Sequence, residues 1–145
     1  MFDALLRRLA GPAPSPLPET EARLALAALL VRLARADGDY APLEIARIDA
    51  VLAHRYALSS EAAGNLRAEA ETLEAKAPDT VRFTRALKEA VPLEARAGLL
   101  EAMWSVVLTD DHRDDNEDQI MRLVSSLLGL SDRDSAEARQ RATRA

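Results

Sequence analysis

Two segments of the chain, residues 24–59 and 97–131, carry nearly the same pattern. In each, an apolar run with helical spacing leads into a short acidic segment. A second helical pattern follows, with a Glu near its start and a Leu-Ser pair at its end. An internal repeat of this kind indicates two similar units whose apolar faces are buried against each other. Because no period-two strand pattern occurs, the sequence predicts an all-α fold. We expect a compact bundle of about seven helices built from two pseudo-repeated helix–loop–helix units.

Two of the expected helices are apolar on nearly all sides and belong at the centre of the bundle. They cover residues 24–36 and 97–108, and they occupy equivalent places in the repeat. The second contains Trp104, which the pattern assigns to the core. More amphipathic helices are expected over about residues 42–56, 61–76 and 80–90, between the second acidic segment and Gly129, and after Ser131.

Several residues mark where these helices start and end. Ser59 or Ser60 is suited to cap the third of the domain's helices, and Ser131 is suited to cap the last. Gly129 follows an apolar helical pattern, as expected of a glycine that ends a helix with positive φ. The local signals therefore divide the chain into helices at specific positions.

The N-terminal region differs from the rest of the chain. Residues 1–10 fit a short amphipathic helix, and residues 11–18 hold four prolines, which predict a stiff extended connector. The chain is thus expected to divide into residues 1–18 and a helical domain of residues 19–145. The simplest expectation is that the N-terminal helix packs on its own domain. Docking on a partner, or peripherally on a membrane surface through residues 1–10, is the alternative.

Composition limits the chemistry open to the chain. There is no Cys, which excludes disulfides, zinc-thiolate sites and thiol nucleophiles. The formal net charge is −5, and residues 110–118 hold six carboxylates and one Arg, which equal that charge. This local acidity can bind cations or a basic partner. No secretory signal and no apolar stretch long enough for a bilayer is present, so a soluble, cytoplasmic protein is expected.

Signatures of catalysis are missing. The sequence has no G-x-S-x-G motif, no Gly-rich phosphate loop and no H-E-x-x-H. His54 is interpreted as a surface residue that complements the C-terminal dipole of its helix. The arginines near the C-terminus alternate with carboxylates and lack interleaved aromatic residues, so nucleic-acid binding is not expected. The chain is predicted to be non-enzymatic.

The two acidic segments are the candidate sites. Aligning the repeats pairs Asp37 with Asp110 and Glu44 with Glu117. Carboxylate oxygens favour Ca²⁺, Mg²⁺ or Mn²⁺, and a histidine would also admit Zn²⁺. The candidate metal ligands are Asp37, Asp39, Glu44, Asp110, Asp111, His112, Asp114 and Glu117.

The same carboxylates also have simpler interpretations. Asp114 and Glu117 have the spacing of a capping box, and Glu44 lies at about the third position of its helix, where a carboxylate complements the dipole. On this interpretation the acidic residues are only caps and solvated turns, with Gly38 adopting the positive φ of a turn. A further interpretation is that the acidic surface docks a basic protein partner without metal.

One ordered set of residues resembles a known family. The sequence ADG at residues 36–38 is followed by Glu44, and Asp110 is followed by Glu117, within alanine- and leucine-rich helices. By this pattern, and by the segments RFTRALKEA, LLEAMW and GLSDRD, the chain resembles the TerB-like domains over about residues 19–139. These domains are named for the TerB protein of bacterial tellurite-resistance operons, and the chain is similar to a small bacterial subgroup of them.

The resemblance implies an all-helical bundle in a bacterial cytoplasmic protein, linked to metal sensing or stress response, and it does not imply catalysis. The second segment departs from the family pattern, because Asp111 and His112 stand where a glycine and an acidic residue are usual. The combined expectation is a non-enzymatic module of a tellurite- or metal-resistance-like pathway that binds a divalent cation and has a protein partner. The alternative is a metal-independent protein-interaction module that uses its acidic surface.

Overall fold

The fold of the described residues is entirely helical. The computed structural model describes residues 19–36, 38, 40–76, 80–109 and 115–144. Within these ranges there are seven α-helices and no strand: α2 Glu19–Arg35, α3 Pro42–Tyr56, α4 Ser60–Lys76, α5 Thr80–Ala90, α6 Leu93–Val107, α7 Asp115–Leu127 and α8 Asp132–Arg144. The prediction of an all-α bundle is confirmed. The helix and connector predicted before residue 19 lie outside the described residues.

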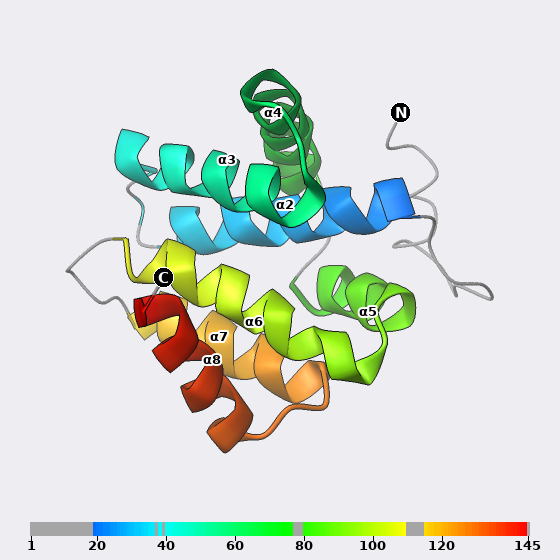
Figure 1. Ribbon diagram of the computed structural model, residues 1–145, viewed down its shortest axis with the longest axis vertical. Coiled ribbons are helices and arrows are strands. Elements are labelled where there is room, and N and C mark those ends of the chain that lie inside the picture. Colours follow the sequence, from blue (N-terminus) through cyan, green and yellow to red (C-terminus); the bar gives the residue numbers. More distant parts are fainter. Residues whose placement is uncertain (1–18, 37, 39, 77–79, 110–114, 145) are drawn as a thin grey trace.

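Helix α2 lies in the middle of the bundle (Figure 1). It contacts α3, α4, α5, α6 and α7. Because leucine and alanine side chains surround its axis, it can bury every side at once. The buried residues of α2 form an almost continuous run: Ala22, Leu24, Ala25, Leu26, Ala27, Ala28, Leu29, Leu30, Val31, Leu33 and Ala34. The first of the two predicted central helices is therefore the core of the fold.

Helix α6 is the second buried helix. It packs against α8, α2, α3 and α7. Its apolar residues Leu99, Leu100, Met103, Trp104, Val106 and Val107 are all buried, as the pattern predicts. Helices α7 and α8 pack beside it in the lower part of Figure 1, and α7 also contacts α2. Both predicted central helices thus supply the core.

The helix ends follow the local sequence signals. The hydroxyl of Ser59 accepts a hydrogen bond from the Ala62 amide (3.1 Å) at the start of α4. Helix α7 ends before Gly129, which has φ +77°, and the Leu130 amide donates back to the Ser125 carbonyl (3.0 Å). Such a reversal satisfies helix-end carbonyls and needs the left-handed conformation that glycine adopts without strain.

Helix α8 begins with a reciprocal cap. The Asp134 amide donates to the Ser131 hydroxyl (3.1 Å), and the Ser131 amide donates to the Asp134 carboxylate (2.9 Å). Hydrogen bonding to the carboxylate by the Ser131 backbone amide, and then by the Ser131 side chain, holds the pKa of Asp134 below its ordinary value. Because the pKa of Asp134 is lowered in the folded state, its carboxylate stabilises the fold fully at pH values above the ordinary pKa of an aspartate. This stabilisation is lost as the pH falls through the lowered pKa.

Replacing Ser131 by alanine is expected to lower the free energy of unfolding by about 1 kcal/mol, because an N-cap acceptor for the first turn is lost. Urea unfolding followed by far-UV circular dichroism measures the change. Ser126→Ala is the matched control, since Ser126 is an exposed serine within α7. Equal effects of the two substitutions would mean that the cap contributes nothing.

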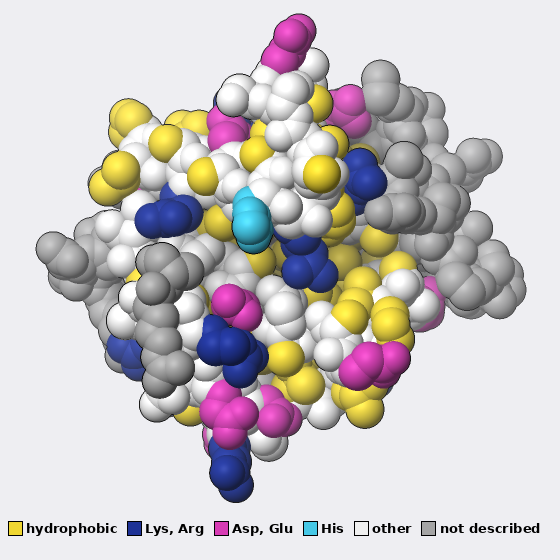
Figure 2. Space-filling view, viewed as in Figure 1, with side chains coloured by type: hydrophobic (Ala, Val, Ile, Leu, Met, Phe, Trp, Pro, Cys, Tyr) yellow, Lys and Arg dark blue, Asp and Glu magenta, His cyan; other side chains and the backbone are white. Residues whose placement is uncertain are grey.

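The surface carries mixed charges with few large apolar side chains. Figure 2 shows Lys and Arg side chains interspersed with Asp and Glu over one face. Among the described residues, the large hydrophobic side chains that are exposed are Leu43, Leu93 and Leu123. None of the helices within the described ranges is both long and apolar enough to cross a membrane.

Candidate functional site

The structure describes two of the eight predicted metal ligands. Glu44 lies in α3 and Glu117 lies in α7. The other six fall outside the described residues: Asp37, Asp39, Asp110, Asp111, His112 and Asp114. The capping box predicted between Asp114 and Glu117 is untested for the same reason.

Both described glutamates are buried. Glu44 and Glu117 are each only 2% exposed, although each is the third residue of its helix. The expectation of solvated carboxylates in these first turns is therefore wrong for Glu44 and Glu117.

The burial follows from the helical period. In α3 the buried residues are Glu44, Ile48 and Leu52, four residues apart, so Glu44 continues the stripe that packs into the core. In α7 Glu117 stands four residues before the buried Met121 in the same way. This spacing is visible in the sequence, and it could have shown that both glutamates face inward.

A buried carboxylate is costly unless polar groups or a cation compensate it. Both glutamates interact with other groups in the fold. The same residue type is therefore held inside the protein at matching places in two helices, where an apolar residue would pack without this cost. Burial also restricts the side chain to few rotamers, which suits a ligand that must be held in place.

The residues that flank the two acidic segments lie next to each other. Asn116 at the start of α7 donates from Nδ2 to the carbonyl of Ala36 at the end of α2 (3.1 Å). Arg47 in α3 donates from Nε to the hydroxyl of Thr109 after α6 (3.2 Å). Figure 1 shows these ends of α2 and α6 and the starts of α3 and α7 at the left of the bundle. The fold thus joins the flanks of both segments at one end of the molecule.

Tyr40, directly after the first acidic segment, is anchored to α4. Its hydroxyl donates to the Glu71 carboxylate (2.8 Å). Arg67 pairs with Asp49 (2.6 Å) and with Glu71 (3.2 Å), so it links α4 to α3. Burial, and then the hydrogen bond to Glu71, raise the pKa of Tyr40 above its ordinary value. The hydrogen bond to Asp49 raises the pKa of Arg67. Tyr40, which follows the first acidic segment, is therefore held in place by a polar network.

The positioned carboxylates do not by themselves complete a metal site. Among the residues whose placement is described, no three His, Cys, Asp or Glu side chains form a group that could hold a metal ion. A complete ligand set would need members of the six candidates outside the described ranges. The cation site stays a prediction, with Glu44 and Glu117 as the two ligands whose places are known.

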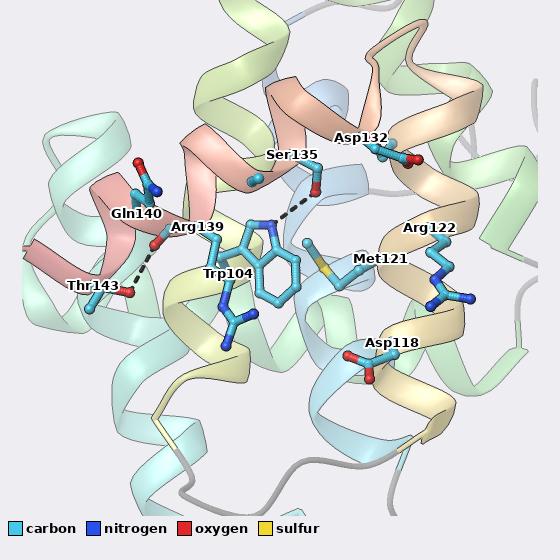
Figure 3. Close-up of a pocket in the computed structure, with 11 residues that line it drawn as sticks. Trp104, Asp118, Met121, Arg122, Asp132, Ser135, Arg139, Gln140 and Thr143 are labelled. Carbon is cyan, nitrogen blue, oxygen red and sulfur yellow. Dashed lines mark hydrogen bonds between the residues drawn. The ribbon is translucent and has the colours of Figure 1, made fainter.

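A pocket of about 670 Å³ lies between α6, α7 and α8 (Figure 3). Trp104 lines it, although the residue is only 6% exposed, and its indole Nε1 donates to the Ser135 hydroxyl (3.2 Å). The guanidinium of Arg139 lies 5.3 Å from the centre of the indole ring. Asp118, the residue after Glu117, is also part of the lining. Trp104 is therefore a core residue, as predicted, and also borders a pocket close to the start of α7.

Comparison with known proteins identifies the family. Residues 23–140 match the family model described as tellurite resistance protein TerB. Neither a curated protein nor a solved structure matches the chain. The match spans helices α3 to α7, most of α2 and α8, and both acidic segments, so it covers most of the chain. The chain belongs to the TerB family.

Proposed function

We propose that this chain is a non-enzymatic helical module that binds a divalent cation through its two acidic segments, in a bacterial stress pathway of the tellurite- or metal-resistance kind. The observation that carries the proposal is the burial of Glu44 and Glu117, each 2% exposed, at equivalent positions of the repeat. The contacts of Asn116 with Ala36 and of Arg47 with Thr109 support one site shared by both segments.

The chemistry follows from the oxygen ligands. The two buried carboxylates would supply fixed ligands, and the aspartates of both segments would complete the coordination. Such a set suits Ca²⁺, Mg²⁺ or Mn²⁺, and His112 would also admit Zn²⁺. A cation would offset the repulsion among carboxylates that are close in the sequence between residues 110 and 118.

Titration of the chelator-treated protein tests the proposal. We expect dissociation constants in the millimolar range or tighter for at least one of Ca²⁺, Mg²⁺, Mn²⁺ and Zn²⁺, measured by calorimetry. Trp104 fluorescence should change in parallel, because its pocket includes Asp118 beside Glu117. A cation present at about 100 times its dissociation constant should stabilise the fold by about 2.7 kcal/mol and raise the melting temperature by roughly 5–10 °C.

Paired variants locate the site. Asp110→Asn combined with Glu117→Gln should abolish the calorimetric signal and the rise in melting temperature, and Glu44→Gln should weaken both. Glu94→Gln is the matched control, because Glu94 is an exposed carboxylate in the first turn of α6. Flat titrations with all four cations would disprove the metal-binding proposal, and so would a Glu94→Gln variant that loses binding equally.

The concentration of charge supports a second candidate function. Residues 110–118 carry a net charge equal to that of the whole chain, which suits direct pairing with a basic protein. In this alternative the module captures its partner without metal. A pull-down with and without chelator separates the two, because direct charge pairing is insensitive to chelator and weakens with salt.

A further inference from the structure

A second groove lies between α3 and α6, and its Arg47 is hydrogen-bonded to Thr109 at the flank of the second acidic segment. It has a volume of about 640 Å³, within the range of small-molecule sites. Helix α3 contributes Arg47, His54 and Arg55, and α6 contributes Gly98, Glu101 and Ser105. Small apolar residues complete the lining: Ala50, Val51, Ala102 and Ala142. Figure 2 shows basic side chains on both sides of a histidine over this part of the surface. The groove therefore combines a basic rim with apolar walls.

Arg47 is oriented by a short chain of hydrogen bonds. Its Nε donates to the Thr109 hydroxyl (3.2 Å), and that hydroxyl donates to the Ser105 carbonyl (2.8 Å). The Thr109 oxygen thus acts as acceptor and donor, which fixes the guanidinium through Nε. Its two Nη groups have no hydrogen-bond acceptor among the described residues, and they carry the remaining N–H donors of the guanidinium.

Arg55 lies across the glycine of α6. A Cβ added at Gly98 would be 3.2 Å from Arg55 Nη1, a tighter contact than side chains normally make. Glycine inside a helix is unfavourable, so the absent side chain is explained by the room it leaves for the guanidinium. Arg55 Nε is buried, and nothing within the described part of the chain accepts its hydrogen bond. Because this nitrogen is inaccessible, a ligand in the groove would meet Arg55 through its Nη groups.

The charges of the groove favour an anion. Glu101 pairs with Arg141 (3.2 Å), so its carboxylate is offset. Arg47 and Arg55 remain as two guanidinium groups, whose planar donors match phosphate oxygens. A phosphate monoester carries a charge of roughly −1.5 to −2 at neutral pH, which these two groups balance.

We propose that the groove between α3 and α6 binds a small organic phosphate. The phosphoryl group would lie between Arg47 and Arg55, and the apolar part of the ligand would contact Val51 and the neighbouring alanines. The groove shares the Arg47–Thr109 contact with the flank of the acidic segments, but none of its lining residues is a proposed cation ligand, so the proposal does not depend on the cation site.

The experiment uses phenyl phosphate as the probe and the full chain in chelator, so that no cation bridges the two. Saturable binding is measured by calorimetry and by amide shifts in α3 and α6. Arg47→Gln and Arg55→Gln should each weaken binding by at least about tenfold, because each removes charge-assisted hydrogen bonds. Gly98→Ala should also weaken it, since the methyl group displaces the Arg55 guanidinium. Arg133→Gln, which removes an 88% exposed arginine from α8, should leave binding unchanged.

Parallel titrations with inorganic phosphate and with vesicles containing phosphatidic acid distinguish the sources of the phosphoryl group. Weaker binding of inorganic phosphate than of phenyl phosphate supports a soluble organic ligand that uses the apolar walls. Vesicle binding without saturable phenyl phosphate binding overturns the proposal, and so does equal weakening by Arg47→Gln and Arg133→Gln. Arg47 is exposed, so its variant remains informative if Arg55→Gln loses the fold in thermal unfolding.

Discussion

Replacing Leu30 by alanine is expected to lower the free energy of unfolding by about 2–5 kcal/mol. Leu30 is fully buried in the middle of α2, the helix that contacts α3, α4, α5, α6 and α7. Helices on several sides enclose this site, so the surrounding structure can close the cavity only in part. The loss therefore includes both the transfer of the removed methyl groups and the cavity left behind. Urea unfolding measures this loss of stability, provided that the slope of the transition is the same with and without the substitution.

The control for this prediction is Leu43→Ala. Leu43 is 65% exposed near the start of α3, so its truncation leaves no cavity and should change stability by less than about 0.5 kcal/mol. The comparison uses the same chemical change at a buried and at an exposed site. A Leu30→Ala variant as stable as Leu43→Ala would contradict the placement of α2 at the centre of the fold.

Replacing Glu74 by glutamine is expected to cost about 2 kcal/mol, because it leaves two arginines without their shared carboxylate. Glu74 in α4 accepts from Arg35 Nη1 (2.7 Å) and from Arg32 Nε and Nη2 (3.3 and 3.2 Å), at the end of α2. Glu74 and Arg32 side chains are only 14% and 19% exposed, so solvent screens this pair less than a surface pair. The Arg32 guanidinium also lies 5.1 Å from the centre of the buried Phe83 ring.

A double-mutant cycle isolates the ion pair. Arg32→Gln, Glu74→Gln and the double variant should give a coupling energy of about 1–2 kcal/mol between the two residues. Glu69→Gln on the same helix is the control, since Glu69 forms no ion pair with the described residues. If Glu69→Gln destabilises the fold as much as Glu74→Gln, the contacts of Glu74 with Arg32 and Arg35 are not what joins α4 to α2.

Much of the fold could be predicted because its signals are local. The apolar runs that became α2 and α6, the cap at Ser131 and the helix end at Gly129 each depend on residues within a few positions of one another. Helical spacing and end chemistry act over that range, so the sequence can be interpreted without knowledge of tertiary contacts. The ordered pattern of the acidic segments also predicts the TerB family, and the family match confirms that prediction.

The candidate site was predicted less completely. The sequence identifies the acidic residues, but the expectation of solvated carboxylates is wrong for Glu44 and Glu117, whose spacing from Ile48 and Met121 places them inward. A first-turn carboxylate usually complements the helix dipole in water, whereas here the core stripe extends to the third residue of both helices.

Local sequence patterns specify which segments are helical, where they end and which two are apolar enough to be central. The contacts of Asn116 with Ala36, of Arg47 with Thr109 and of Arg55 with Gly98 emerge only when the helices pack together. These contacts join residues far apart in the chain, and they depend on how the helices pack around α2. Local patterns specify the face and length of each helix, but the choice of neighbour is made by the fit of several helices at once.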